Sequence, residues 1–160
     1  MDAPKPYLDF FVPGRAAPGG SKRGFYSPKL KRVLMTPASK ATKPWMAIVS
    51  AYAMEAMNAA GQAVSNIQTV AMLVWIEFLM ERPKKHFRTG KHAGELRPDA
   101  QKWHTVKPDL TKLCRSTEDA MSGIVWRDDS LIAMHNLQKR YANPNETPGA
   151  HVKVFLLEVP

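Results

Sequence analysis

The sequence contains a single cysteine, Cys114, among its 160 residues, so no disulfide can form within the chain. Such cysteine usage is typical of a reducing compartment. The sequence also lacks an apolar run of membrane-spanning length. The segment 1–14 lacks the basic stretch followed by an apolar core that marks a secretion signal. We therefore expect a cytoplasmic protein without a membrane partner.

Positive charge is absent from one part of the chain and concentrated in two others. Residues 46–80 contain no Lys or Arg, whereas residues 1–45 contain nine and residues 81–115 contain ten. The net charge is +9. Clustered positive charge favours a polyanionic partner, of which nucleic acid is the commonest, although net charge also serves solubility alone.

The length and the apolar content of 44% predict one domain, residues 1–160, with a modest core. Hydrophobic periodicity predicts two helices, at 44–60 and 109–121. The segments that read as strands are 8–12, 33–35, 69–80, 131–141 and 151–159. The strand at 69–80 is apolar enough to be buried on most of both faces. This order of elements predicts an α+β fold, a mixed β-sheet with two main helices packed on one face.

Two basic segments, at about 13–32 and 81–106, are rich in Gly and Pro and are predicted to be loops. Phe25 and Tyr26 lie among the cations of the first, where they would either stack on bases or pin the loop to the core. The cations of the first segment would then hold phosphates. Those of the second would follow a nucleic-acid backbone, or else belong to a solvated insertion. The candidate DNA contacts are Lys22, Arg23, Lys84, Lys85 and Arg88, together with Lys107 and Lys112 further along.

Residues 107–130 contain an unusual mixture of acids and cations. The acids are Asp109, Glu118, Asp119, Asp128 and Asp129. Because a Mg²⁺ site needs only one or two protein carboxylates beside water and phosphate oxygens, grouped acids in a basic protein suggest a metal site. Adjacent acids also occur in ordinary turns and on solvated helix faces, so the pattern alone leaves both interpretations open.

The same segment resembles the RusA family of Holliday junction resolvases. The family pattern runs roughly P-D-x-D-N-L-x-K, then D-A-L-x-G, then V-W-x-D-D-S-Q, and the resemblance covers residues 107–135. The matching residues are Pro108, Asp109, Leu110, Leu113, Arg115, Asp119, Ala120, Gly123, Val125, Trp126, Asp128, Asp129 and Ser130. This resemblance implies an α+β homodimer that cuts four-way DNA junctions with Mg²⁺, or with Mn²⁺. The family occurs in bacteria and their viruses.

The resemblance assigns the metal-site acids to Asp109, Thr111 and Asp129, so the middle ligand is not an acid in this chain. The family's helical lysine corresponds to Arg115, which would offset charge in the transition state, and its asparagine to Lys112. Asp128 would ligate the metal or orient water.

Thr111, Arg115 and Glu118 share one helix face by their spacing. Glu118 would therefore reach towards the metal, or else face solvent and pair with Arg115. Asp119 is expected to cap or pair structurally, and the five histidines are read as ordinary residues.

The sequence thus predicts a Mg²⁺-dependent endonuclease that resolves four-way junctions by paired phosphodiester hydrolysis in recombination and repair. A DNA-binding protein with weak or no catalysis is the alternative, because Thr111 replaces a family acid. A nuclease acting on flaps or other branched DNA is a third reading. The segments 44–60 and 69–80 are candidates for the dimer surface, although core packing explains them equally well.

Overall fold

The computed structural model describes residues 5–20, 22–37, 39–62 and 68–157, without the side chains of residues 22, 23 and 35–37. The strands are β1 (Leu8–Pro13), β2 (Lys22–Ser27), β3 (Arg32–Pro37), β4 (Met72–Met80), β5 (Ile132–Tyr141) and β6 (Gly149–Leu156). The helices are α1 (Thr42–Ala59) and α2 (Leu110–Met121), and three short 3₁₀ turns lie at Lys84–His86, Gly90–His92 and Asp129–Leu131. The predicted α+β class is confirmed.

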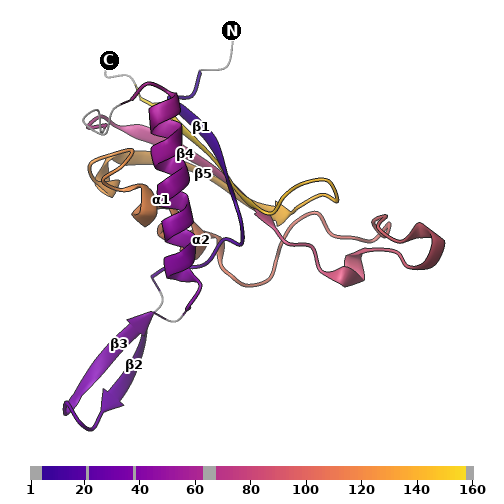
Figure 1. Cartoon of the computed structure of the whole chain (residues 1–160), viewed down its shortest axis with the longest axis horizontal. Helices are drawn as coiled ribbons and strands as arrows, with labels where there is room; N and C mark the ends of the chain where they lie inside the picture. Colours follow the sequence, from indigo (N-terminus) through magenta and orange to yellow (C-terminus); the bar gives the residue numbers. More distant parts are fainter. Residues whose placement is uncertain (1–4, 21, 38, 63–67, 158–160) are drawn as a thin grey trace.

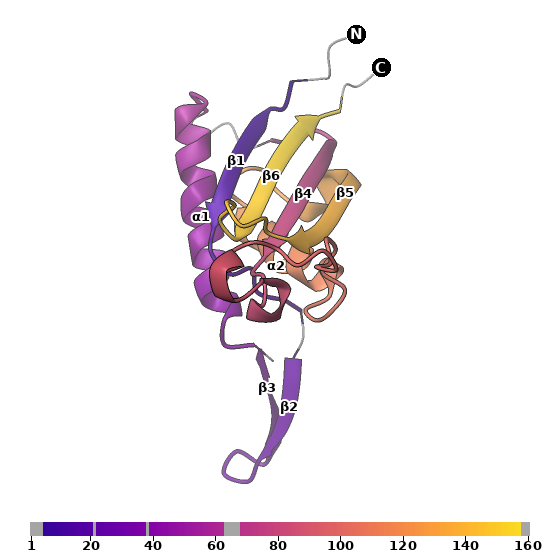
Figure 2. The same ribbon diagram turned by 90° about the vertical axis from the view of Figure 1, so that its right-hand side faces the viewer.

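Four strands form one mixed sheet in the order β1-β6-β4-β5 (Figure 2). β4 and β5 run parallel, whereas β6 runs antiparallel to both of its neighbours, β1 and β4. The parallel pair is possible because the long segment between β4 and β5, which contains α2, provides the crossover. This crossover is what brings α2 beside β5.

The two helices pack on one face of the sheet, as predicted. Trp45, Val49, Ala53 and Met57 recur at helical spacing and form the buried side of α1. They share one hydrophobic core with the inward residues of the sheet and of α2. The principal members of this core are Trp45, Trp126, Phe78, Met57, Met72, Ile76, Leu113, Met121, Val12, Val49, Val74 and Val125.

The prediction that β4 is buried on most of both faces is wrong. Burial alternates along Met72–Phe78, and the intervening residues, including Trp75 and Glu77, remain partly exposed. Glu77 is accommodated on this open face because it pairs with Arg140 of β5 at 2.8 Å. β4 also lies between two strands, so its edges are unavailable to a second copy of the chain.

The segment 13–32 is not a loop throughout, because it contains β2. β2 pairs with β3 in an antiparallel hairpin, with Phe25 opposite Leu34 and Tyr26 opposite Val33. The predicted strand at 33–35 is therefore confirmed, and its partner was hidden by a Gly-, Pro- and Lys-rich composition. The hairpin projects away from the body of the molecule (Figures 1 and 2).

The loop predicted at 81–106 is confirmed apart from its two short 3₁₀ turns. It extends from the sheet as a second projection (Figure 1). Within the described part of the chain, no helix has the length and apolarity needed to cross a membrane.

Candidate active site

Helix α2 is fixed to the rest of the core by side chains of α1. Trp45 donates its Nε1–H to Thr117 Oγ1 at 3.1 Å, and Ser50 donates to the carbonyl of Ala120 at 2.8 Å. Thr117 in turn donates to the Leu113 carbonyl at 2.8 Å. Since both partners of the Trp45–Thr117 bond are buried, this contact sets the rotation of α2 about its axis.

The segment after β1 crosses α2 closely. Ser116 donates to the carbonyl of Ala17 at 2.6 Å, and Gly19 donates its backbone N–H to the carbonyl of Lys112 at 2.8 Å. A Cβ on Gly19 would lie 2.9 Å from the Ser116 Cβ, so only glycine fits there. A Cβ on Gly20 would lie 2.7 Å from the Arg115 side chain. The approach to the hairpin therefore passes directly beside Arg115.

The turn that follows α2 is held by the strand-like segment before β4. Arg127 donates its backbone N–H to the carbonyl of Gln68, and Gln68 donates to that of Val125, both at 3.1 Å. Trp126 is fully buried, and its Nε1–H donates to Asp129 Oδ1 at 2.8 Å. A rigid indole thus fixes the orientation of the Asp129 carboxylate.

Asp128 has a different role from Asp129. Its carboxylate accepts the backbone N–H of Ser130 at 2.9 Å and begins the 3₁₀ turn Asp129–Leu131. Hydrogen bonds from Ser130 lower the pKa of Asp128, so this acid is ionised at neutral pH. Asp128 acts as a capping residue that positions its neighbour.

The face of α2 predicted from spacing opens onto a cavity of about 540 Å³, which we call the acidic cavity. Thr111, Arg115 and Glu118 line it together, which confirms that they share a face. The full lining is Thr111, Lys112, Cys114, Arg115, Glu118, Asp119, Asp129, His135 and Leu137. Helix α2, strand β5 and the turn bearing Asp129 each contribute to it.

The carboxylates of the acidic cavity influence one another. The pKa of Asp119 is raised by partial burial and then by the negative charge of Asp129, although Arg115 acts in the opposite direction. Negative charge is therefore crowded at this point, and a cation would relieve it. Asp119, which is predicted to cap or pair structurally rather than to bind metal, lines the cavity.

The pairing of Glu118 with Arg115 on a solvated surface is not what the structure shows. The Glu118 side chain is only 13% exposed and forms a short ion pair with His135 Nε2. Glu118 also accepts a hydrogen bond from the Cys114 thiol, whose pKa is raised far above its usual range by burial and then by the Glu118 charge. His135 was missed because no sequence signal shows that β5 returns beside α2.

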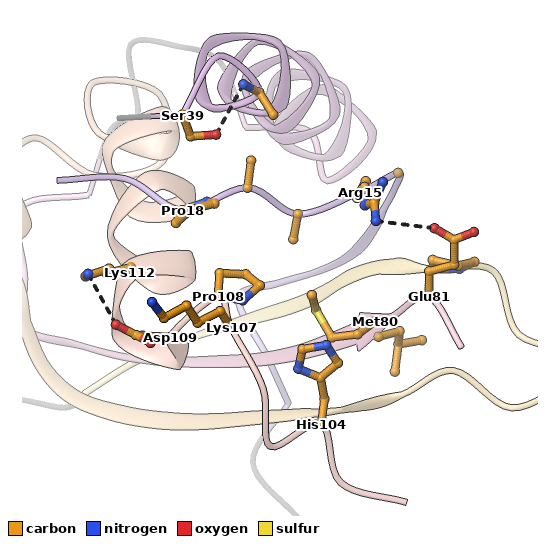
Figure 3. Close-up of a pocket in the computed structure, with 16 residues that line it drawn as sticks. Arg15, Pro18, Ser39, Met80, Glu81, His104, Lys107, Pro108, Asp109 and Lys112 are labelled. Atoms are coloured by element: carbon orange, nitrogen blue, oxygen red, sulfur yellow. Dashed lines mark hydrogen bonds and ion pairs between the residues drawn. The ribbon is translucent and has the colours of Figure 1, made fainter. Parts of the chain in front are cut away.

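Asp109 lies in a neighbouring cavity of about 570 Å³, the N-terminal cavity of α2 (Figure 3). It is the N-cap residue that precedes α2, and its carboxylate pairs with Lys112 Nζ at 3.2 Å. Lys107 and Arg15 also line this cavity, and Lys112 lines both. The structure therefore brings Thr111, Glu118 and Asp129 together in one cavity and places Asp109 in the adjoining one.

The stretch that leads into Asp109 is anchored by a cation from β5. Lys139 Nζ donates to the carbonyls of Val106 and Pro108, at 2.9 and 2.6 Å. Partial burial lowers the pKa of Lys139, an effect that Asp109 opposes. In this way β5 holds one end of α2 through Lys139 and faces its middle through His135.

The acidic cavity has the chemistry of a divalent-cation site. Asp129 keeps one carboxylate oxygen that is not engaged by Trp126, and Glu118 and Asp119 face the same cavity. Hard oxygen donors with room for water suit Mg²⁺. The oxygen donors of the acidic cavity therefore fit the expected ion.

The residues expected to contact DNA are spread over both projections. The backbones of Lys22 and Arg23 lie in β2, and their side chains lie outside the described part of the structure. Lys84, Lys85 and Arg88 are exposed on the loop 81–106, although Arg88 also pairs with Glu95 at 3.0 Å. Phe25 and Tyr26 are 50% and 61% exposed, so they do not pin the hairpin to the core.

Comparison with known proteins identifies the family of the chain. The family model described as endodeoxyribonuclease RusA matches residues 16–154, which include both helices, the hairpin and the acidic cavity. A search of curated proteins gives no match. Because the family model spans most of the sequence, the chain belongs to the RusA family of endodeoxyribonucleases.

Proposed function

We propose that this protein is a Mg²⁺-dependent, structure-selective endonuclease that resolves four-way DNA junctions by paired phosphodiester hydrolysis in recombination and repair. The observation that carries the proposal is the convergence of Asp129, Glu118 and Asp119 with Arg115 in one open cavity. Membership of an endodeoxyribonuclease family supports phosphodiester hydrolysis as the reaction.

In this proposal Asp129 and Glu118 hold Mg²⁺, with Asp119 and the hydroxyl of Thr111 beside them. When bound, Mg²⁺ lowers the pKa of a water molecule and offsets charge on the reacting phosphate. Trp126 holds Asp129 in place, and Asp128 caps the turn that presents it. Arg115 faces the same cavity and offsets the negative charge that develops on the phosphate.

Asp109 is proposed to act at the boundary between the two cavities. Lys112 lines both of them and pairs with Asp109, so a nucleic-acid backbone crossing from one cavity to the other would meet both residues. Contact of a phosphate with Lys112 would release Asp109 from its ion pair. Asp109 would then be free to join the metal ligands, as the family resemblance implies.

The two projections are proposed to supply the preference for branched DNA. The hairpin presents exposed aromatic rings, which can stack on the base pairs whose stacking is interrupted at the branch point of a junction. The loop 81–106 presents exposed cations, including Lys84 and Lys85, for the phosphates of an arm. A duplex without a branch offers no interrupted base-pair stack to the hairpin.

A symmetric homodimer is part of the proposal, because two equivalent sites related by a two-fold axis would cut opposing strands of a junction. β5 is the strand at one edge of the sheet, and its residues 133–136 are exposed. Sedimentation of the protein alone and with a junction would give the oligomeric state.

The test uses a labelled four-way junction and a linear duplex of the same sequence, each with Mg²⁺ and with chelator. We expect paired, symmetric nicks in the junction that require Mg²⁺ and are lost in Asp129→Asn. Salt-dependent junction binding without cleavage, in Mg²⁺ or Mn²⁺, would instead establish the DNA-binding alternative. Equal cleavage of flaps and junctions would establish a nuclease of broader selectivity.

A further inference from the structure

A set of three chemically different side chains converges on one wall of the acidic cavity. These are Cys114 and Glu118 of α2 and His135 of β5, which we call the Cys–Glu–His cluster. The Cys114 Sγ, a Glu118 carboxylate oxygen and a His135 ring nitrogen all lie within 4.8 Å of one another. We propose that this cluster binds a divalent transition-metal ion of the Zn²⁺ or Co²⁺ type, at a site that shares Glu118 with the expected Mg²⁺ site and adds the sulfur of Cys114 and the imidazole of His135.

The positions of the three residues suit a shared ligand. Cys114 and Glu118 are one helical turn apart, so both project to the same face of α2. His135 reaches them from the neighbouring strand and already contacts Glu118. In a tetrahedral zinc site, bonds of about 2.0–2.3 Å place neighbouring donor atoms about 3.5 Å apart. Small side-chain rotations would therefore bring these donors to bonding distance.

The exposure of the side chains increases across the cluster, from the buried Cys114 to the exposed His135. Cys114 is 4% exposed, whereas the side chains of Glu118 and His135 are 13% and 40% exposed. Three protein ligands leave a fourth position for water or for a phosphate oxygen. Asp119 and Asp129 line the same cavity, so the surrounding negative charge favours a cation.

The donor types select the metal. A thiolate and an imidazole are poor ligands for Mg²⁺, which prefers oxygen, but they suit Zn²⁺ and Co²⁺. On binding, the Cys114 S–H bond breaks, an S–metal bond forms and the proton passes to solvent. Glu118 exchanges its hydrogen bonds from Cys114 and His135 for the metal, and His135 binds as the neutral ring. Binding is therefore expected to weaken as the pH falls.

The test is a titration of the metal-free protein with Co²⁺, followed by absorption. We expect one equivalent to bind, with a near-ultraviolet band from charge transfer between the thiolate and the metal. Cys114→Ser should abolish that band, and His135→Gln should weaken Co²⁺ binding at least tenfold. His151→Gln is the matched control, because His151 pairs with Asp9 on the open face of the sheet and should leave the titration unchanged.

His135 is exposed, so its replacement does not threaten the fold, and circular dichroism would confirm this for each variant. The proposal is overturned if the wild-type protein shows no thiolate band, or if His135→Gln binds Co²⁺ as tightly as the wild type. Because these readouts need no DNA, they are independent of the nuclease. Junction cleavage in Mg²⁺ without Co²⁺ binding would remove this site alone, and Co²⁺ binding without cleavage would remove the proposed nuclease alone.

Discussion

The buried indole of Trp126 donates its Nε1–H to Asp129 Oδ1 across 2.8 Å and thereby fixes the carboxylate that faces the acidic cavity. The two residues are only three positions apart in the sequence, but the orientation of Trp126 depends on contacts made by the rest of the turn. Trp126 is held by the core, and its neighbours Val125 and Arg127 are bonded to Gln68. The Asp129 carboxylate is therefore held in a fixed orientation in the lining of the acidic cavity.

Replacing Trp126 with Phe keeps an aromatic ring in the core and removes the hydrogen bond to Asp129. Loss of a partner that orients a metal ligand typically costs about 10- to 100-fold in metal affinity or activity. We expect the Mg²⁺ concentration for half-maximal cleavage to rise by a factor in that range. Trp75→Phe, on the open face of the sheet, is the control. An unchanged Mg²⁺ dependence in Trp126→Phe would show that Asp129 needs no such support.

The repulsion between the Asp119 and Asp129 carboxylates should lower the free energy of unfolding in a pH-dependent way. Because the pKa of Asp119 is raised by burial and then by Asp129, the folded chain holds this proton more tightly than the unfolded chain. The cost is present above the folded pKa and disappears as the pH falls to the ordinary value for Asp, about 4.

Asp119→Asn is therefore expected to be slightly more stable than the wild type at pH 7 without divalent ions, by up to about 0.5 kcal/mol. The difference should vanish near pH 3. Adding Mg²⁺ should stabilise the wild type more than the variant. Chemical unfolding at the two pH values tests this, and a difference that stays constant with pH would contradict it.

The hydrogen bond between Trp45 and Thr117 joins α1 to α2, and we predict that its loss destabilises the protein. Thr117→Val keeps the volume of the side chain but leaves the buried Trp45 Nε1–H without its acceptor. An unsatisfied buried donor costs about 1–3 kcal/mol. We expect the free energy of unfolding in urea to fall by that amount. Thr89→Val, in the exposed loop, should change it little, and equal stability of the two variants would show that the α1–α2 bond is dispensable.

The exposed rings of the hairpin should matter for junction binding but not for folding. Removal of a stacking ring typically costs about 1–3 kcal/mol per base, so Phe25→Ala or Tyr26→Ala should weaken junction binding about 5- to 150-fold. Binding to linear duplex should change much less. Leu30→Ala and Val33→Ala, which remove similarly exposed apolar side chains of the hairpin, are the matched controls. If all four variants bind alike, the rings do not stack on the junction.

Local sequence patterns predicted the helices and strands better than the contacts between them. The spacing of Trp45, Val49, Tyr52 and Ala56 correctly predicted α1, although Tyr52 and Ala56 are only partly buried and the buried positions beside them are Ala53 and Met57. The spacing of Thr111, Arg115 and Glu118 correctly placed them on one face. By contrast, the contact of Glu118 with His135 depends on a strand that returns beside α2 after a turn. No local periodicity encodes such a contact.

The first strand of the hairpin, β2, was missed for a related reason. Residues 22–27 have no core to face, so their strand lacks an alternation of buried and exposed apolar residues. β2 is therefore formed by its pairing with β3, and not by the burial of alternate apolar side chains that marks the other strands. The same lack of burial leaves Phe25 and Tyr26 exposed, where they can contact a partner.

The central claim is that the acidic cavity is the nuclease centre, with Glu118 supplying the carboxylate that position 111 lacks. The most direct measurement is the rate of junction cleavage in Mg²⁺ by Glu118→Gln and Asp129→Asn, beside Glu55→Gln on the exposed side of α1. We predict that the first two lose at least 100-fold in rate while still binding the junction, and that Glu55→Gln matches the wild type. Wild-type cleavage rates in both cavity variants would contradict the account.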